Sequence, residues 1–518
     1  MSDWDVVVIG SGFGGAMVAH RAVAAGARVL MIERGDWVPR GDAAWKPDAS
    51  LELTESYAKD IPYRCDRGGH GPVIGAYACV GGPSVFYGCV GFRFREQDFV
   101  GDPGVVAGSG AAWPFRYDEI EPFYAEAEQL LGIHGDDSGD PTAPRRSTPF
   151  PYPPAPLAPI SQRVAEAAVD LGLSPFHLPL AINHSVTEQR KTCISCRTCD
   201  TYACAIEAKN DVATMMIAPL VKRGLTLWTR TIAVRLETAD GRVSKLHLWH
   251  RGSNGERGRA ESITAKRYVL AGGALGTPHL LLASKIDVLS PARAAFGRYL
   301  MRHDNTMVFG FFPSRPDPER VFHKQLALHD WYFGDPENDD VADLTKLGGV
   351  QQMMTPPKEL VRAHVPRGTK GVIGAMTEQL TGLLCIAEDQ PRVDNGVTVD
   401  WDHRDVYGLP QLVIDHSYSP RDRRANGALV VRAKQVLSKT GAMFFHSHHV
   451  KTFSHVVGTM RMGTDPATSP LDGRCNVRGV DNLFVTDGSA LPMSAGVNPS
   501  LTIAANALRV GAGIVSGG

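Results

Sequence analysis

The hydrophobic pattern is clearest at the start of the chain. Residues 6–9 are four β-branched apolar residues in a row, as expected for a parallel strand that is buried on both faces. A glycine-rich turn follows over residues 10–15, then a stretch of helical character at 16–25 and a second strand-like run at 28–32. Strand, helix and strand in so short a span predict a βαβ unit.

The strand-to-glycine pattern returns further along the chain. Residues 268–270 lead into the glycine-rich segment 271–278, and helical character follows at 279–284. Near the C-terminus a strand is predicted at 483–486, then a turn and a helix at 498–510. Both places therefore predict a strand that ends in a tight turn before a helix.

The middle of the chain has a different pattern. Helical spacing covers residues 160–171, and 225–236 has strand character. Between 309 and 438, short alternating segments are separated by turn residues; 396–400 and 412–415 are two of them. This pattern predicts a mainly antiparallel sheet.

Composition narrows the class of protein. Hydrophobic residues make up 43% and charged residues 21% of the 518 residues, which is ordinary for a globular protein. The formal net charge of −1 gives no electrostatic reason to expect nucleic acid or an anionic membrane as a partner. Neither a signal-peptide pattern nor an apolar run of bilayer length is present, so we expect a cytoplasmic protein whose oligomeric state is open.

The first glycine turn carries a nucleotide-binding pattern. In Gly10-x-Gly12-x-x-Gly15, the glycines provide a tight turn, an approach for a pyrophosphate, and close packing of helix on strand. Glu33 ends the second strand, where a carboxylate can accept hydrogen bonds from ribose. This predicts a dinucleotide site without separating FAD from NAD. Asp487, after the C-terminal strand, is placed either to hold part of a flavin nucleotide or as a turn residue.

Several segments together resemble the glucose–methanol–choline (GMC) oxidoreductases. In chain order they are the unit from Gly10 to Glu33, the cluster Gly81-Gly82-Pro83-Ser84, the segment 271–278, the run from His455 through Gly458-Thr459 to Gly463, and residues 496–502. Motifs in the right order are more specific than any one of them alone. The match covers both ends of the chain and is weak in the middle, where the family sets its choice of substrate.

The resemblance implies an α/β fold, α+β when the whole chain is counted. A discontinuous Rossmann-like FAD-binding domain would comprise residues 1–100, 190–300 and 455–518, and a substrate-binding domain with a mainly antiparallel sheet would comprise 101–189 and 301–454. It also implies the residues around FAD, which are Gly10, Gly12, Phe13, Gly14, Gly15, Glu33, Arg34, Gly81, Gly82, Ser84, Tyr87, Gly88, Ala271, Gly272, Asp487, Gly488, Asn498 and Pro499.

A catalytic pair is implied by the same resemblance. Oxidation of an alcohol requires removal of the hydroxyl proton and transfer of a hydride to the flavin. A neutral imidazole is suited to take the proton, and His455 matches the motif histidine of the family. Asn498 matches the position occupied by His or Asn, where an amide can donate to the oxygen as negative charge develops.

The second glycine cluster departs from the commonest family pattern. Tyr87 stands where many members have asparagine, and an aromatic residue there resembles the pyranose oxidases. In some of those enzymes a histidine at the position of Phe86 bonds covalently to the flavin. Phenylalanine cannot form such a bond, so we expect non-covalent FAD. Pyranose oxidases and bacterial glycoside 3-oxidases are the nearest analogues, which predicts a sugar or glycoside whose secondary hydroxyl is oxidised, with O₂ or another electron acceptor.

Closely spaced thiols occur in one segment. The candidate ligands for an iron–sulfur cluster or zinc are Cys193, Cys196, Cys199 and Cys204. A cluster would favour a dehydrogenase with a protein acceptor, and its absence would favour an oxidase; a local disulfide or reduced cysteines that stabilise a loop are the structural alternatives. The odd total of nine cysteines argues against a disulfide framework.

Other interpretations are weighed against this one. His446, His448 and His449 resemble a metal tract but have no acidic or cysteine neighbour in the sequence, so we interpret them as a strand or loop edge. A cyanohydrin lyase of the same family, an electron-transferring subunit, and an aliphatic or sterol alcohol oxidase are the competing functions. The lyase would not have its flavin bleached by a polyol, and the subunit would not need the pair His455 and Asn498.

Overall fold

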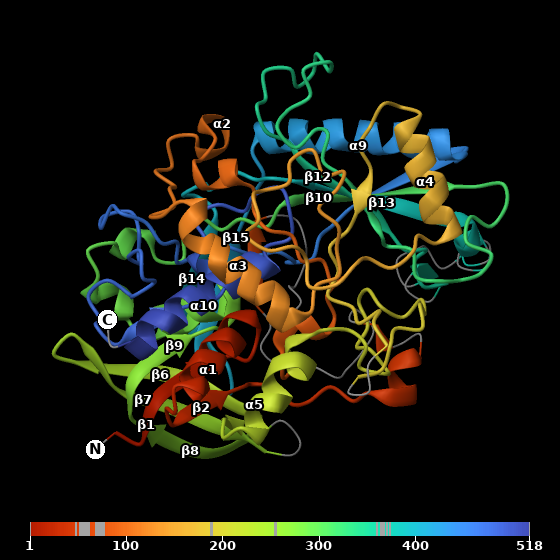
Figure 1. The fold of residues 1–518 in the computed structure, drawn as a ribbon. Coiled ribbons are helices and arrows are strands. Elements are labelled where there is room, and N and C mark those ends of the chain that lie inside the picture. The colour runs from red at the N-terminus through yellow and green to blue at the C-terminus, as the bar shows by residue number, and fades with distance from the viewer. Residues whose placement is uncertain are drawn as a thin grey trace.

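The computed structural model describes residues 2–516 except 47–48, 51–62, 68–77, 187–189, 253–255 and most of 359–375. Its described part is built around a parallel sheet in the lower half of Figure 1 and a larger antiparallel sheet in the upper half. Two further three-stranded sheets complete the described strands. Among the described helices, none has the length and apolar character needed to cross a membrane.

The parallel sheet has the order β17-β9-β1-β2-β5. Its central strand β1 (Trp4–Ile9) lies between β2 (Val29–Ile32) and β9 (Ala265–Leu270), and β17 (Leu483–Val485) and β5 (Thr226–Trp228) form the edges. All neighbouring pairs are parallel. The side chains of β2 are all buried, as expected for a sheet with both faces covered. The predicted Rossmann-like α/β arrangement is confirmed.

Helices from both ends of the chain pack together beside this sheet. Helix α1 (Phe13–Ala24) contacts α10 (Ser500–Ser516), and α10 contacts α3 (Tyr117–Leu131). Figure 1 shows α1 and α10 side by side at the lower left, beside the parallel sheet. The short helices α2 (Pro103–Val106) and α5 (Ala218–Lys222) lie in connecting segments. The sheet is therefore assembled from segments that are far apart in the sequence.

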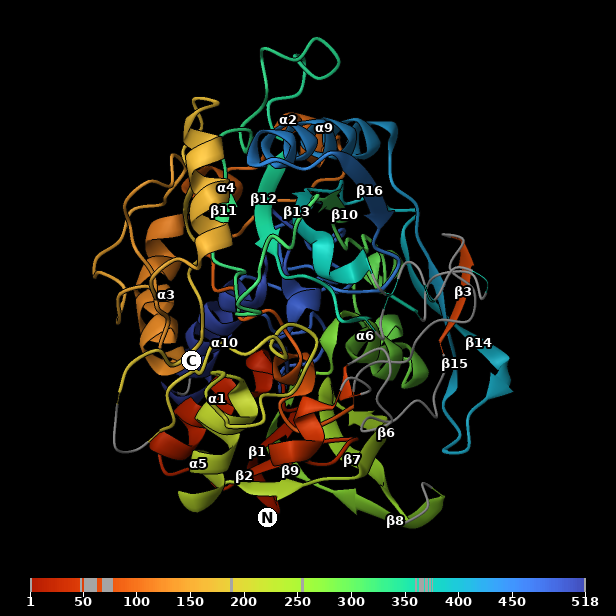
Figure 2. The same ribbon diagram turned by 90° about the vertical axis from the view of Figure 1, so that its right-hand side faces the viewer.

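The antiparallel sheet has six strands in the order β16-β10-β13-β12-β11-β4. These strands are β16 (Phe444–His449), β10 (Asp304–Phe311), β13 (Leu380–Ala387), β12 (Gly348–Met353), β11 (Leu326–Leu328) and β4 (Phe176–His177). Helices α9 (Pro420–Thr440) and α4 (Pro159–Val169) pack together against it (Figures 1 and 2). The antiparallel sheet predicted for the middle of the chain is confirmed.

The structure adds detail to two sequence predictions about strands. The segment of strand character at 225–236 contains two strands, β5 and β6 (Thr231–Ala239), which belong to different sheets. The chain turns between them at Arg230, whose φ of +52° is left-handed. An apolar pattern does not report such a turn. Strand β6 pairs with β7 (Arg242–Arg251), which pairs with β8 (Arg257–Ile263).

The region 309–438 was also expected to form one sheet. Its segments 396–400 and 412–415 instead lie in β14 (Gly396–Arg404) and β15 (Pro410–Asp415), which form a separate sheet with β3 (Arg64–Arg67). The end of the region is the long helix α9, which begins after a Ser419 cap and ends at Gly441. Side-chain alternation indicates strands but not which strands pair.

Helix α6 begins earlier than the sequence predicted. The sequence predicts it at 279–284, but it spans Gly273–Ala283 with Pro278 inside. A proline at this position cannot donate to the carbonyl of Ala274, four residues earlier. The Thr459 hydroxyl donates to that carbonyl instead, at 2.7 Å. This bond connects α6 to the segment that follows His455.

This compensation can be measured by a double-mutant cycle. Thr459→Val should lower the free energy of unfolding by about 1–3 kcal/mol, because it leaves the buried Ala274 carbonyl without a donor. In a Pro278→Ala background the restored backbone N–H can bond to that carbonyl, so the same substitution should cost less. Urea unfolding of the four proteins measures both losses. Equal losses in the two backgrounds would contradict the compensation.

Candidate active site

Glycines allow the turns of the parallel sheet to meet closely. A Cβ atom on Gly10 would lie 2.3 Å from the carbonyl oxygen of Ala271, and one on Gly14 would lie 2.3 Å from that of Thr486. A Cβ on Gly15 would lie 2.1 Å from the oxygen of Gly10. These contacts join the turn after β1 to the ends of β9 and β17.

Gly12 differs from these packing glycines. A Cβ atom built there would meet no atom within 4 Å, and no side chain caps the helix α1 that starts at the next residue. A Cβ on Gly82, in the second glycine cluster, would lie 3.4 Å from the Cα of Gly12. The open space, the uncapped N–H groups and the helix dipole fit the pyrophosphate of a dinucleotide.

The carboxylate of Glu33 is engaged by the protein. It accepts hydrogen bonds from the backbone N–H of Ser11 at 3.1 Å, the Ser11 hydroxyl at 2.6 Å and the N–H of Gly35 at 3.0 Å. The Ser11 hydroxyl also accepts from the N–H of Gly81 at 2.9 Å. Burial raises the pKa of Glu33, although these donors oppose the shift. Glu33 therefore joins the two glycine turns, and its predicted contact with ribose stays a prediction.

Asp487 has a corresponding place on the other side. Its carboxylate accepts from the N–H of Gly273 at 2.9 Å and the hydroxyl of Thr277 at 2.5 Å, and from the N–H of Ser489 at 2.8 Å. Burial raises the pKa of Asp487. The acid thus connects the start of α6 to the segment after β17, a stronger role than that of a simple turn residue.

The remaining residues predicted to surround FAD lie in the same turns. The Ser84 hydroxyl donates to the carbonyl of Gly81 at 2.7 Å, and the Tyr87 ring packs edge-on against Phe13, 5.5 Å between centroids. A Cβ on Gly88 would lie 2.3 Å from Nζ of Lys324. The others stand after β2, between β9 and α6, after β17 and before α10: Arg34, Ala271, Gly272, Gly488 and Pro499.

The structure brings the predicted catalytic pair into contact. Nδ2 of Asn498 lies 3.1 Å from Nε2 of His455, although 43 residues separate them in the chain. Burial lowers the pKa of His455 well below its ordinary value, and the nearby His303 and Lys324 side chains lower it further. The imidazole is therefore neutral near neutral pH, as a proton acceptor must be.

Two neighbours of this pair were missed in the sequence. Nδ1 of His303 lies 3.1 Å from Nδ1 of His455, and Nε2 of His303 lies 3.0 Å from the carbonyl oxygen of Ser494. On the other side Nε2 of Gln351 donates to Oδ1 of Asn498 at 2.6 Å. His303 precedes β10 and Gln351 lies within β12, so only the folded sheet places them here.

A buried carboxylate positions both segments beside His455. Asp389, just after β13, accepts from the backbone N–H groups of Arg302 at 2.8 Å and His303 at 3.1 Å. It also accepts from the hydroxyl of Ser494 at 2.8 Å. One side chain at the end of β13 thus holds the segment that carries His303 and the loop that leads to Asn498.

The adjacent Glu388 holds the same loop. It accepts from the backbone N–H of Ala495 at 3.0 Å, and its second oxygen lies 2.5 Å from Nζ of Lys346. Lys346 also pairs with Asp98 at 2.6 Å. All of these charged side chains are almost completely buried. Removal of any one of them would therefore leave a buried charge without its partner, which is strongly destabilising.

The backbone is strained around the pair. His303, His455 and Ala495 have φ values of +57°, +58° and +58°, in a region that side-chain-bearing residues rarely occupy. Such conformations persist only where surrounding contacts enforce them, and they gather at active sites. The hydrogen bonds from the backbone N–H of His303 to Asp389 and from that of Ala495 to Glu388 enforce two of these three conformations.

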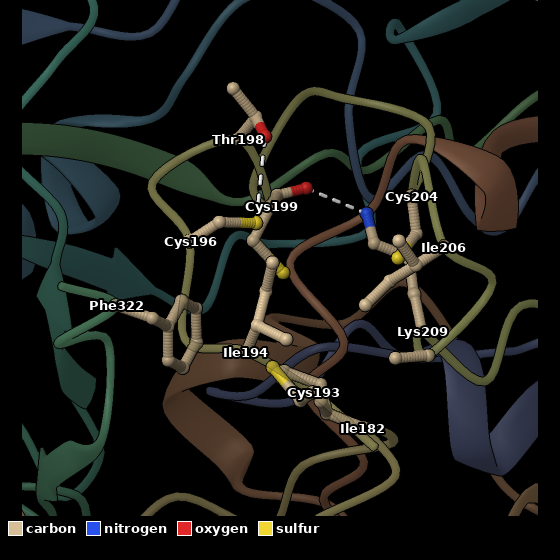
Figure 3. Close-up of a pocket in the computed structure, with 11 residues that line it drawn as sticks. Ile182, Cys193, Ile194, Cys196, Thr198, Cys199, Cys204, Ile206, Lys209 and Phe322 are labelled. Atoms are coloured by element: carbon tan, nitrogen blue, oxygen red, sulfur yellow. Dashed lines mark hydrogen bonds between the residues drawn. The ribbon is translucent and has the colours of Figure 1, made fainter. Parts of the chain in front are cut away.

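The cysteines of the predicted cluster line one pocket. Figure 3 shows that they share it with the buried Lys209, whose Nζ donates to the carbonyls of Tyr87, Cys199 and Tyr202; the cysteines are Cys193, Cys196, Cys199 and Cys204. A hydrogen bond from Cys89, with help from Lys209, lowers the pKa of Cys199 to about 7, whereas burial raises that of Cys193 to about 12. No group of three or more potential ligands within the described residues could hold a metal ion. As arranged, the thiols do not fit an iron–sulfur or zinc site.

The histidine tract lies at the edge of the antiparallel sheet. It forms β16, as the strand interpretation predicted, and pairs with β10. Nε2 of His449 lies 2.6 Å from Oδ1 of Asp304, an acid that the sequence places far away. His446 is exposed, so the tract is peripheral to the pair His455 and Asn498.

Comparisons with known proteins give the same assignment at the level of the family. Models of the GMC oxidoreductase family match residues 151–303 and 391–507. The chain is 31% identical to 6'''-hydroxyparomomycin C oxidase of Streptomyces lividus and 30% identical to paromamine 6'-oxidase of Streptomyces fradiae. These alignments cover 99% and 98% of this chain, and 91% and 90% of the relatives. The crystal structure of pyridoxine 4-oxidase from Mesorbium loti shares the fold, with a TM-score of 0.64, 19% identity and 99% of both chains covered. This chain belongs to the GMC oxidoreductase family.

Proposed function

We propose that the protein uses FAD to oxidise a hydroxyl group of a pyranose sugar or glycoside to a carbonyl, and passes the electrons to O₂, giving H₂O₂, or to another acceptor. The observation that carries the proposal is the contact between His455 and Asn498, with a neutral imidazole next to an amide donor. The names of the relatives from Streptomyces support a sugar-like substrate. A secondary ring hydroxyl is our choice from the resemblance to glycoside 3-oxidases.

The protein's part in the reaction is to orient the alcohol and accept its proton. A substrate hydroxyl that replaces the direct contact of the pair would donate its hydrogen to Nε2 of His455 and accept a hydrogen bond from the Asn498 amide. As the proton leaves, the amide stabilises negative charge on the oxygen. FAD, when bound, supplies the acceptor for the hydride. Because burial keeps His455 neutral, the base is ready without prior loss of a proton.

FAD binding without a covalent bond is part of the proposal. Phe86 is buried in the second glycine cluster and offers no nucleophile. Gly12→Leu should yield folded protein with little FAD, because the side chain would occupy the open space at the start of α1. Gly427→Leu, on the exposed side of α9, is the matched control and should retain FAD. Flavin absorbance before and after acid precipitation measures both occupancy and release; full occupancy in the Gly12 variant, or flavin that stays with the precipitate, would contradict the proposal.

Anaerobic bleaching of the flavin tests the reaction. Two probes are used, methyl β-D-glucopyranoside and paromamine. The first tests the secondary ring hydroxyls that we propose. The second is added because position 6' in the name of one relative is the exocyclic carbon of a pyranose rather than a ring carbon. Flavin reduction should be about 10²–10⁴-fold slower in His455→Ala, with FAD still bound, because the proton acceptor is lost. His446→Ala, on the exposed edge strand, should react like the wild type. Bleaching by a fatty alcohol but by neither sugar would refute the substrate class, and an unimpaired His455→Ala would refute the base.

The pH dependence follows from the low pKa of His455. The imidazole must be neutral to accept a proton, and burial moves its pKa well below about 6.5. The kcat/KM for flavin reduction should therefore stay level from about pH 8 down through about pH 6.5, and fall only at more acidic pH. Stopped-flow measurements of flavin reduction across this pH range test the prediction. An acidic limb with a midpoint above about 6.5 would show that another group limits the reaction.

A further inference from the structure

The pair His455 and Asn498 forms the middle of a longer chain of hydrogen-bonding groups. The order is the Ser494 carbonyl, His303, His455, Asn498 and Gln351, with successive distances of 3.0, 3.1, 3.1 and 2.6 Å. Each contact has one donor and one acceptor. Fixing the direction of one contact therefore restricts all the others.

The direction is set at the Ser494 end. A backbone carbonyl only accepts, so Nε2 of His303 must carry the hydrogen that is donated to Ser494. In a neutral His303 the other nitrogen, Nδ1, then has a lone pair. Burial lowers the pKa of His303, which favours this neutral form.

The next contact follows from the first. Nδ1 of His303 faces Nδ1 of His455, and a lone pair on the former requires a hydrogen on the latter. A neutral His455 with hydrogen on Nδ1 has its lone pair on Nε2. That nitrogen faces the amide of Asn498, which can donate to it while Oδ1 of the same amide accepts from Gln351. The far end of the chain is consistent with the direction set by Ser494.

His303 itself is held firmly in place. Its backbone N–H donates to Asp389, and its carbonyl accepts from the Tyr418 hydroxyl at 2.7 Å. Asp389 also accepts from the hydroxyl of Ser494, so the same carboxylate fixes the residue that accepts from the His303 ring. The left-handed φ of +57° at His303 is maintained by these contacts.

We propose that His303 is a positioning residue that fixes the tautomer of His455, so that the basic nitrogen is the Nε2 beside Asn498. The proposal rests on the function of His455 as base and deepens it. His303 need not touch the substrate or give up a proton. Its Nδ1 keeps accepting from His455 after that ring becomes an imidazolium, and so stabilises the charge that proton transfer creates.

A matched pair of substitutions separates the two sides of the His303 ring. In His303→Asn the side-chain oxygen lies near the place of Nδ1 and can still accept from His455. In His303→Gln the amide reaches the place of Nε2 and can still donate to Ser494, but no acceptor faces Nδ1 of His455. If His303 served only as a polar side chain in the fold, the two variants would not differ in the tautomer of His455.

Nitrogen NMR of the oxidised holoenzyme, labelled with ¹⁵N-histidine, reads the tautomer directly without any substrate. The signals of His455 are those lost in His455→Asn. We expect a protonated Nδ1 and an unprotonated Nε2 in the wild type and in H303N, and gain of the Nε2-protonated form in H303Q. Flavin reduction should slow by about 10²-fold in H303Q and by much less in H303N.

Either of two results would overturn the proposal. One is a wild-type His455 protonated on Nε2, which decides the question even if H303Q fails to fold. The other is an H303Q holoenzyme with the wild-type tautomer. Failure of the proposed function is distinguishable: full activity of His455→Ala would remove His455 as base without changing its tautomer signal in the wild type.

Discussion

The proposed active site depends on two adjacent carboxylates, Glu388 and Asp389, which are buried at the end of a strand in the antiparallel sheet. Between them they accept hydrogen bonds from the segment that carries His303 and from the loop before Asn498. An unpaired buried charge is costly, so these bonds are difficult to break. The carboxylates therefore transmit the rigidity of the sheet to backbone conformations that side chains seldom adopt.

The other half of the molecule uses the same principle with glycines. Turns from distant segments meet where Gly10 and Gly14 leave no room for a side chain, and the carboxylates of Glu33 and Asp487 hold those turns together. A Cβ on Gly12, between Gly10 and Gly14, would instead face open space. The Thr459 hydroxyl connects this half to the segment that follows His455 by completing the hydrogen bonding of α6. The proposed cofactor site and the proposed base are therefore parts of one bonded framework.

The sequence predicted those elements and site residues that belong to a recognisable motif. The βαβ unit and the glycine turns could be found from residue type and order, and the pair His455 and Asn498 from the resemblance to the family. Glu33 and Asp487 were also located, although the bonds they make to other protein segments could not be foreseen. His303, Gln351 and Asp389 could not be found, because they occur in no motif and reach the site only through pairing of strands. The left-handed turn at Arg230 and the proline inside α6 were missed because tertiary contacts override local propensity.

If His303 fixes the tautomer of His455 as proposed, His303 affects the reaction only through His455. The most direct measurement is the rate of anaerobic flavin reduction in His455→Ala, H303Q and the double variant, with the sugar that bleaches the wild-type flavin. Residues that act as a unit are strongly non-additive. We predict that the double variant reacts as slowly as His455→Ala and no more slowly. Losses that multiply in the double variant would contradict the account, because His303 would then contribute independently of the base.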